Sequence, residues 1–498
     1  MKRRELSIAL TLLFIVALPF AAAGQSRQDR NRAKVLQDQA DKAVREKNYR
    51  DASDKYSQAL VLVADNPYAH FWKGTANWYL WQDGERRLAN LETQRRQETN
   101  AMRQQNLNGQ IAQQKSENDQ AIQLALNELN IALSQGFRPL EVYRIRAYIL
   151  YEQKNYDDAL VEIRRGLALA PKDLPFLKSL AEVHLARNAY ADALTALRNA
   201  AQVAPNDADI HYNLARVHFA LRDTKAQQSA AETALAKGTR FVGETHYLLG
   251  DAHRKLRNQA GAIDALQKAV NAKPDLYQAY RDVADVFRSE NRFTDAINIT
   301  KKGILAFPGD GNLYTDLSWF YSLAGRPDEA VQAAKEAIGI LPNQYVAYTN
   351  LCRAYNETKQ HDLAITACNT ALRLQPNDGE TYYYLGNANV ALGRSVEANR
   401  LYTRAVTGLV DYTQKNPEYS DGWYLLGNAY FADRQIDKAI ESYLKCLALS
   451  PKFLKARVNL GISYTRARNR AAATEQYSIV LRADPALAAI LKGEIDKM

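Results

Sequence analysis

A small residue and a proline recur together every 34 residues along most of this 498-residue chain. In one cycle Ala147 and Ala159 lie twelve residues apart, and Pro171 follows after another twelve. Further cycles hold the same register at Ala181, Ala193, Pro205, Ala284, Ala296, Pro308, Gly427, Ala439, Pro451, Gly461, Ala473 and Pro485. A period of this length is typical of repeat arrays, in which each unit packs only on its neighbours. The chain is therefore predicted to form one extended array rather than about three separate globules.

Each cycle contains the pattern of two helices. In the segment 422–451, Trp423 begins an apolar stripe at i, i+3, i+4 and i+7, which forms one face of a helix. A matching stripe of a second helix begins at Ala439. Because Gly427 and Ala439 are small, the two backbones can approach closely, and Pro451 ends the hairpin because it cannot continue a helix.

This pattern resembles the tetratricopeptide repeat, a helix–turn–helix of 34 residues. The resemblance covers nearly all of the chain beyond its first two dozen residues. It implies an all-α fold, a right-handed superhelical α-solenoid of about twelve helix-turn-helix (TPR) repeats. The small residue of each second helix, or its substitute, is expected at Ala52, Ala125, Ala159, Ala193, Gln227, Ala262, Ala296, Ala330, Ala364, Ala398, Ala439 and Ala473.

The N-terminus has the pattern of an export signal. Residues 2–4 are basic, residues 6–20 are apolar, and residues 21–23 are three alanines that suit cleavage. The apolar run is shorter than the roughly 20 residues of a membrane span. We therefore predict a cleavable signal peptide at 1–23 and an exported chain, periplasmic or secreted in a bacterium; an uncleaved anchor is the alternative.

The array can be divided by its repeats. We expect N-terminal TPR units at 33–137, central TPR units at 138–274, further TPR units at 275–417, C-terminal TPR units at 418–485, and a capping helix at 486–498.

The second repeat contains a long polar insert at 84–119, which is rich in Gln, Arg, Asn and Glu and has no aromatic residue. We predict that both helices of this hairpin extend outward as a projecting polar helical arm of roughly 25 Å. Asn108-Gly109 is the turn signal in its middle. Leu88, Leu91, Met102, Leu107 and Ile111 would form a thin apolar seam. The alternative is a disordered insert.

The sequence shows no pattern of catalysis or of metal binding. It has no glycine-rich phosphate loop, no paired-cysteine metal motif, no HExxH and no GxSxG. We therefore predict no catalytic residues, no metal site and no cofactor. The formal net charge is +10, but the basic residues are scattered, so nucleic acid is not an expected partner.

Two clusters allow more than one interpretation. Five histidines occupy positions that the repeat normally gives to core aromatics: His184, His211, His218, His246 and His253. They are predicted to be packing residues; a metal site, a pH-sensitive joint and an unfamiliar active site are the alternatives. Cys352 and Cys368 face the seam between two helices of one hairpin, where they form either a disulfide or two buried free thiols.

The resemblance also implies a binding surface. In tetratricopeptide proteins the first-helix stripe opposite the packing stripe lines a concave groove that contacts extended peptides. Carried over to this chain, the groove residues are Asn350, Arg353, Tyr383, Asn387, Tyr424, Asn428 and Asn459. Amides can bond a peptide backbone, and tyrosines supply rigid contact area with a polar tip.

We therefore predict an exported, non-catalytic scaffold or adaptor that binds protein or extended peptide partners, with no stable membrane span in the mature chain. The alternative is an assembly factor or structural subunit of a cell-envelope secretion, pilus or outer-membrane complex.

Overall fold

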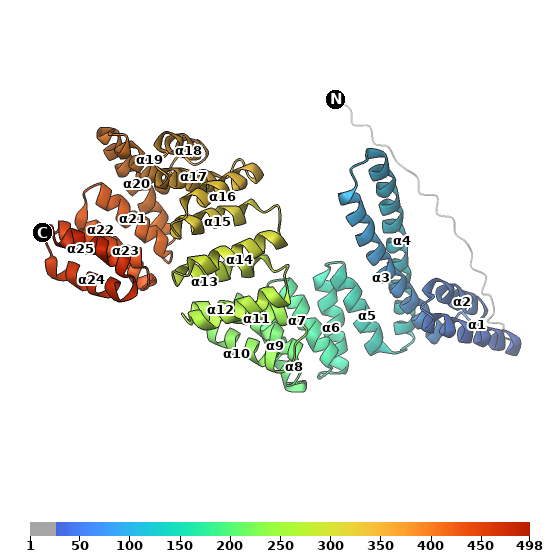
Figure 1. Ribbon diagram of the computed structural model, residues 1–498. Coiled ribbons are helices and arrows are strands. Elements are labelled where there is room, and N and C mark those ends of the chain that lie inside the picture. Colours follow the sequence, from blue (N-terminus) through green and yellow to red (C-terminus); the bar gives the residue numbers. More distant parts are fainter. Residues whose placement is uncertain (1–25) are drawn as a thin grey trace, which may run out of the picture. The chain divides into compact units, whose positions relative to one another are not determined.

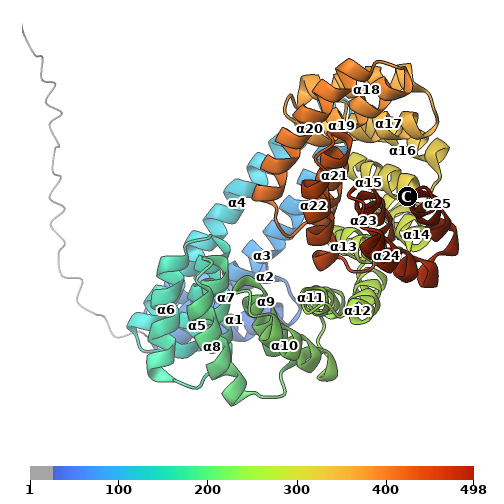
Figure 2. The same cartoon turned by 90° about the vertical axis from the view of Figure 1, so that its left-hand side faces the viewer.

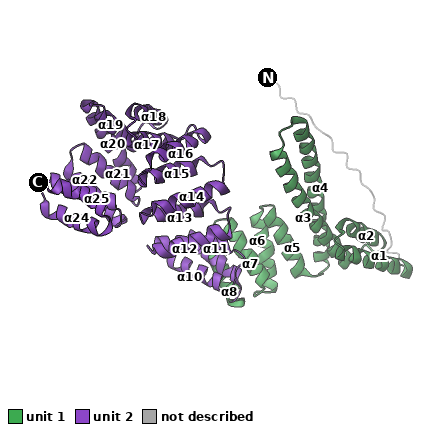
Figure 3. Cartoon of the chain, in the orientation of Figure 1, with its two compact units in different colours: residues 1–205 green, residues 206–498 purple. Residues whose placement is uncertain are grey.

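The computed structural model describes residues 26–498, so the predicted signal peptide at 1–23 lies outside the described residues. The described chain contains 25 α-helices and no strand (Figure 1). It divides into two compact units, described in turn below, at Pro205 and Asn206 (Figure 3). No helix within residues 26–498 combines the length and the apolar character needed to cross a membrane.

Unit 1, as far as it is described, comprises residues 26–205 and eight helices. Their bounds are α1 (Arg27–Arg45), α2 (Tyr49–Leu62), α3 (Pro67–Gln97), α4 (Ala101–Ser134), α5 (Pro139–Glu152), α6 (Tyr156–Leu169), α7 (Leu174–Ala186) and α8 (Tyr190–Val203).

Unit 2 comprises residues 206–498 and seventeen helices. Their bounds are α9 (Ala208–Ala220), α10 (Thr224–Ala236), α11 (Val242–Lys255), α12 (Gln259–Ala272), α13 (Tyr277–Ser289), α14 (Phe293–Ala306), α15 (Gly311–Leu323), α16 (Pro327–Ile340), α17 (Tyr345–Glu357), α18 (His361–Leu374), α19 (Gly379–Ala391), α20 (Ser395–Lys415), α21 (Ser420–Ala432), α22 (Ile436–Leu449), α23 (Leu454–Arg466), α24 (Arg470–Ala483) and α25 (Pro485–Ile495).

The hairpins form where the sequence pattern predicts them. Helices α1 to α24 pair into twelve hairpins, and α25 packs on α23 and α24 as the cap. All twelve small-residue positions of the second helices, including the substitute Gln227, are 0% exposed. The all-α superhelical repeat fold predicted from the sequence is thus confirmed, and the core of each unit consists of clusters that neighbouring hairpins build together.

Turns inside the hairpins use a left-handed residue. In most hairpins it is a polar or basic residue, such as Lys154 or Arg434 with φ of 60° and 63°, and only Gly325 and Gly393 are glycines. The left-handed conformation costs a residue other than glycine roughly 1–2 kcal/mol, so tertiary packing of the hairpin offsets this cost in nearly every repeat.

The insert of the second repeat is helical. Helix α3 has 31 residues and α4 has 34, against 14 in α2, and the 17 additional residues of α3 add about 25 Å at 1.5 Å per residue. The two helices pack along each other as the predicted polar arm (Figures 1 and 2).

The turn of the arm does not lie where the sequence predicted it. Helix α3 ends at Gln97 and α4 begins at Ala101, so Asn108 and Gly109 lie inside α4 and their assignment to a turn was wrong. The physical reason is the helix cap at Asn100, whose side chain accepts hydrogen bonds from the backbone nitrogens of Met102 and Arg103 at 3.0 and 3.1 Å.

The apolar seam of the arm is thinner than predicted. Ile111 is buried, but Met102 is 81% exposed at the tip and takes no part in the seam. Polar packing replaces the missing contacts, because the buried Asn118 donates a hydrogen bond to Glu85 at 2.9 Å. An added Cβ at Gly84 would lie 1.9 Å from Oδ1 of Asn118, so only glycine admits this contact.

The position of Gly109 leads to a prediction. Its ideal Cβ would meet nothing within 4 Å, and the residue lies in the interior of α4. Gly109→Ala should therefore raise the free energy of unfolding of the arm by about 0.5–1 kcal/mol, because alanine loses less conformational entropy in a helix. Circular dichroism during thermal unfolding measures this. A loss of stability would show that Gly109 occupies a left-handed turn in solution.

Candidate functional site

Unit 2 contacts itself across several repeats. The side chain of Lys452 lies 2.5 Å from Glu290, and Nδ2 of Asn291 donates to the backbone oxygen of Lys452 at 2.5 Å. Nζ of Lys455 donates to the backbone oxygen of Leu323 at 3.3 Å. These partners are 132 to 162 residues apart in the chain. A solenoid repeat ordinarily contacts only its neighbours, so these bonds close the superhelical turn of unit 2 on itself, and both views show the ends of α13 and α15 beside α21 and α23 (Figures 1 and 2).

Arg288 is the buried centre of this closure. Its guanidinium lies 2.7 Å from Asp285 on its own helix and 2.8 Å from Asp421 at the start of α21. It also lies 4.8 Å from the centre of the Trp319 ring. The Arg288 side chain is 11% exposed, so the closure depends on a desolvated ion pair and not on surface charges alone.

The closed turn surrounds a chamber of about 850 Å³. Its wall is formed mainly by first helices of successive repeats, α15, α17, α19 and α21, with α23 at one end. Helix α20 also contributes, because it has 21 residues where other second helices of unit 2 have 13 or 14. The extension brings Asp411, Tyr412 and Lys415 into the chamber wall.

Six of the seven predicted groove residues line this chamber: Asn350, Arg353, Tyr383, Asn387, Tyr424 and Asn428. The seventh, Asn459, lines an adjoining hollow of about 610 Å³, which shares Tyr383, Asn387 and Asn428 with the chamber. The fold thus brings the predicted residues onto one continuous concave surface. Their role in binding remains a prediction.

The amides of this surface already have internal bonds. Asn350 donates to the backbone oxygen of Thr315 at 3.0 Å and accepts from Arg353 at 2.9 Å. The side-chain oxygen of Asn428 accepts from Tyr443 at 2.7 Å and from Asn459 at 2.8 Å. Asn350 therefore holds neighbouring groups in place, and its side chain has little capacity left for a ligand.

Arg353 is the buried cation of the chamber. The residue is 7% exposed, and its guanidinium lies 5.7 Å from the centre of the Tyr384 ring. Besides the bond to Asn350, its Nη1 lies 3.7 Å from Glu380, and its Nε has no hydrogen-bond partner among the described residues. The pairing of Arg353 with Glu380 is thus loose.

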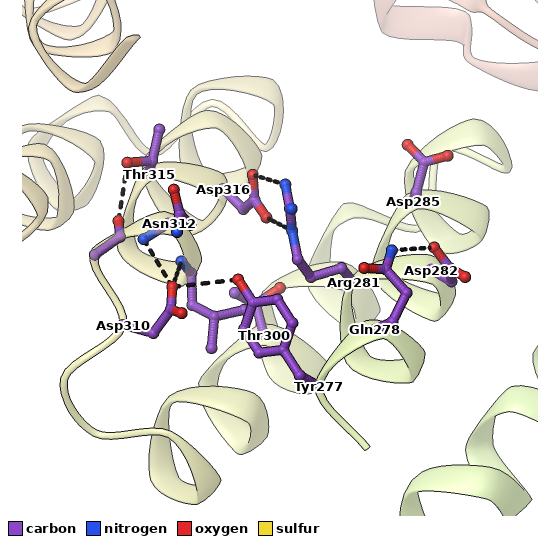
Figure 4. Close-up of polar contacts among 12 residues, drawn as sticks. Tyr277, Gln278, Arg281, Asp282, Asp285, Thr300, Asp310, Asn312, Thr315 and Asp316 are labelled. Carbon is purple, nitrogen blue, oxygen red and sulfur yellow. Dashed lines mark hydrogen bonds and ion pairs between the residues drawn. The ribbon is translucent and has the colours of Figure 1, made fainter. Parts of the chain in front are cut away.

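Carboxylates in the chamber wall are the residues that sequence reasoning missed. Arg281 of α13 pairs with Asp316 of α15 at 2.8 Å (Figure 4), and Arg288 pairs with Asp421. Burial raises the pKa of Asp316, Asp378 and Asp421. In the sequence these residues have the pattern of solvent-facing charges on amphipathic helices, whereas in folded unit 2 they lie partly buried in the chamber wall.

Glu380 has the most strongly altered acidity of these groups. Burial raises its pKa to about 7, and the neighbouring charges of Asp378 and Asp421 add to this effect, while Arg353 opposes it. Strongly perturbed carboxyls in a cleft are typical of functional sites. Because burial favours the neutral form of Glu380, its charged form lowers the stability of the folded protein without a ligand.

This leads to a prediction for Glu380→Gln. Between the ordinary pKa of 4.5 and about 7 the folded state binds the proton more tightly than the unfolded state, so stability falls as the pH rises through this window. At pH 8 the variant should be about 1–2 kcal/mol more stable than the wild type, and at pH 4 it should be equal. Urea unfolding at both pH values measures this. The exposed Glu441→Gln is the control; a variant that is destabilised at pH 8 would contradict the prediction.

The histidine-rich repeats are placed in helices α7, α9 and α11. His218 is buried, the other four are partly buried, and burial lowers the pKa of His184 and His246. Across residues 26–498 no group of three or more His, Cys, Asp or Glu side chains is arranged to hold a metal ion. The packing interpretation remains the simplest one.

Helices α17 and α18 are joined by a disulfide. Cys352 and Cys368 form a disulfide between α17 and α18, with Cα atoms 5.3 Å apart. Of the two alternatives left open by the sequence, the structure therefore has the disulfide. Cys446 is a buried free thiol, and burial raises its pKa.

Family comparisons agree with the hairpin architecture. Models described as "Tetratricopeptide repeat" match residues 226–277, 247–310, 321–388 and 420–453, and a model described as "TPR repeat" matches residues 181–221. The chain belongs to the tetratricopeptide repeat family.

Similarities to individual proteins are weak. One curated relative is a UDP-N-acetylglucosamine–peptide N-acetylglucosaminyltransferase of Giardia intestinalis, which is 32% identical over 83 residues; these cover 17% of this chain and only 6% of that protein.

Among solved structures, MamA is 22% identical with a TM-score of 0.31 and matches 36% of this chain and 95% of its own. The APC/C hetero-tetramer Cut9–Hcn1 is 15% identical with a TM-score of 0.38 over 93% of this chain and 96% of its own. The C-terminal part of a TPR repeat-containing protein from Cytophaga hutchinsonii is 18% identical with a TM-score of 0.37, over 56% and 98%.

Proposed function

We propose that this protein is an exported, non-catalytic scaffold that binds protein partners as extended peptide segments in the chamber of unit 2. The observation that carries the proposal is the convergence of six predicted groove residues on one cavity of about 850 Å³. This volume lies within the range of about 300–1,000 Å³ found for small-molecule pockets, so the chamber holds a short stretch of a partner's chain. The chamber wall offers tyrosines, whose rings and hydroxyls suit contact with a peptide, while the internal bonds of Asn350 and Asn428 hold this wall in place.

Peptide selection tests this function. A random twelve-residue display library is panned against the purified protein, and the enriched peptides are labelled for fluorescence anisotropy. Tyr424→Ala removes an aromatic side chain from the chamber wall and should weaken binding at least about tenfold, because aromatic anchors carry much of the energy of an interface.

Tyr419 provides the matched control. It lies just before α21, is 53% exposed, and is outside both cavities. Tyr419→Ala should leave the affinity within about twofold of the wild type. If no peptide is enriched, or if Tyr424→Ala binds as tightly as the wild type, the proposed function is wrong.

Export is supported by two features. The N-terminus has the pattern of a signal peptide, and the disulfide between Cys352 and Cys368 suits an oxidising compartment. Sequencing the N-terminus of the protein purified from a bacterial periplasm should give Gly24. A chain that stays in the cytoplasm and still begins at Met1 would contradict export.

A further inference from the structure

We infer that the chamber takes a basic side chain, lysine or arginine, of the bound peptide against the carboxylates of Asp378 and Glu380. This inference rests on the proposed function, because it specifies the peptide chemistry that the same chamber selects. The ligand class follows from the charges in the wall, from their pairing and from the rings around them.

The wall of the chamber carries more carboxylates than cations. Six carboxylates line it: Asp316, Glu357, Asp378, Glu380, Asp411 and Asp421. The lysine and arginine side chains that line it are Arg353, Lys415 and Lys455. This balance is opposite to that of the whole chain, whose formal net charge is +10.

Three of the six carboxylates have a close partner of their own. Asp316 pairs with Arg281 at 2.8 Å, Asp421 with Arg288 at 2.8 Å, and Asp411 with Lys415 at 2.7 Å. Two of these cations, Arg281 and Arg288, reach the carboxylates from outside the lining. The negative charges of these three carboxylates are thus compensated without a ligand.

The other three carboxylates share two cations. Glu357, Asp378 and Glu380 have only Arg353 and Lys455 near them in the lining, and the closest approach is 3.7 Å between Arg353 and Glu380. Asp378 has no ion pair among the described residues, but it accepts hydrogen bonds from the backbone nitrogen of Thr381 at 2.8 Å and from the Thr381 hydroxyl. The three carboxylates therefore outnumber the two cations by one, and two of them, Asp378 and Glu380, lie two residues apart at the N-terminal end of α19.

Arg353 compensates Glu380 only in part, because its Nη1 lies 3.7 Å from the carboxylate. Its side chain is 8% exposed, bonded to Asn350 and packed near the Tyr384 ring. These contacts hold the guanidinium at this distance from Glu380. A cation of the ligand would complete the compensation of its charge.

Aromatic rings complete the pocket. Tyr345, Tyr384 and Tyr412 line the chamber, and each lies close enough to Glu380 to interact with it electrostatically. Tyr412 is 45% exposed, so its ring is available to a ligand. Rings beside a carboxylate favour ammonium and guanidinium groups through cation–π attraction, whereas an acidic side chain would be repelled.

The peptide selection described above tests the inference when it is run in parallel on the wild type, Glu380→Gln and the control Glu441→Gln. In the wild type, one position of the enriched peptides should hold lysine or arginine at least about fivefold above the library. Glu380→Gln should lose this enrichment, and Glu441→Gln, which lies outside both cavities, should keep it. Thermal unfolding confirms that each variant is folded.

A double-mutant cycle then assigns the contact. Replacing the enriched basic residue of one peptide by leucine should weaken binding to the wild type about tenfold and binding to Glu380→Gln less than about threefold. Enriched peptides without a basic position, or equal losses in both proteins, would overturn the inference while leaving peptide binding intact. Failure to enrich any peptide would overturn the proposed function together with it.

Discussion

Arg288→Ala is expected to lower the free energy of unfolding of unit 2 by about 3–5 kcal/mol. The substitution leaves Asp421, a partly buried carboxylate, without its cation, and breaking a buried ion pair from one side has a cost of this order. It also removes the stacking on Trp319. Urea unfolding followed by tryptophan fluorescence measures the change.

Hydrogen exchange distinguishes loss of the closure from a local defect in α13. In an open solenoid a substitution affects its own repeat and the adjacent ones. In the closed turn, Arg288→Ala should also lower the protection of amides in α21 and α23, although Asp421 is 133 residues away in the chain. Unchanged exchange in these two helices would show that unit 2 is open in solution.

The control for this experiment is Arg400→Ala. Its side chain is 76% exposed and lies 3.8 Å from Glu397 on the same helix. Exposed pairs of this kind contribute about 0–1 kcal/mol, so the control should unfold within 1 kcal/mol of the wild type. A control as damaging as Arg288→Ala would mean that unit 2 responds to any lost arginine.

Much of the fold can be predicted from the sequence because each hairpin is specified by residues that lie close together in the chain. Small residues in the second helices, such as Ala439 and Ala473, specify where two backbones meet, and the structure buries every one of them. The same periodicity places Tyr424 and Asn428 on the concave face, one turn apart. Both inferences need only the register of one hairpin.

The closure could not be predicted in the same way. Whether Arg288 meets Asp421 depends on small rotations between repeats, which add up over four hairpins and which the pattern of a single repeat does not encode. The acidic chamber was missed for this reason, since its wall combines carboxylates of several repeats, from Asp316 in α15 to Asp421 in α21. The prediction from the sequence also misplaced the turn of the arm. The cap at Asn100 fixes the start of α4, and the helix accommodates Asn108 and Gly109 in its interior.

The extension of α20 requires a contact that only glycine permits. Gly408 of α20 faces the start of α19, and an added Cβ would lie 2.6 Å from the backbone oxygen of Asn377 and 2.7 Å from the backbone nitrogen of Gly379. These are backbone atoms, which cannot move aside as the end of a side chain can. Because both glycines line the chamber, this close contact also positions Tyr412 in its wall.

Gly408→Ala should therefore lower the free energy of unfolding by about 2–3 kcal/mol, since overpacking a close backbone contact exceeds the gain in helix propensity. Gly339→Ala is the matched control, because Gly339 lies in α16 and its added Cβ meets nothing within 4 Å. It should raise stability by about 0.5–1 kcal/mol. Opposite signs in urea unfolding are the expected result. A neutral or stabilising Gly408→Ala would mean that α19 and α20 are farther apart in solution, and that the extension of α20 does not form this wall of the chamber.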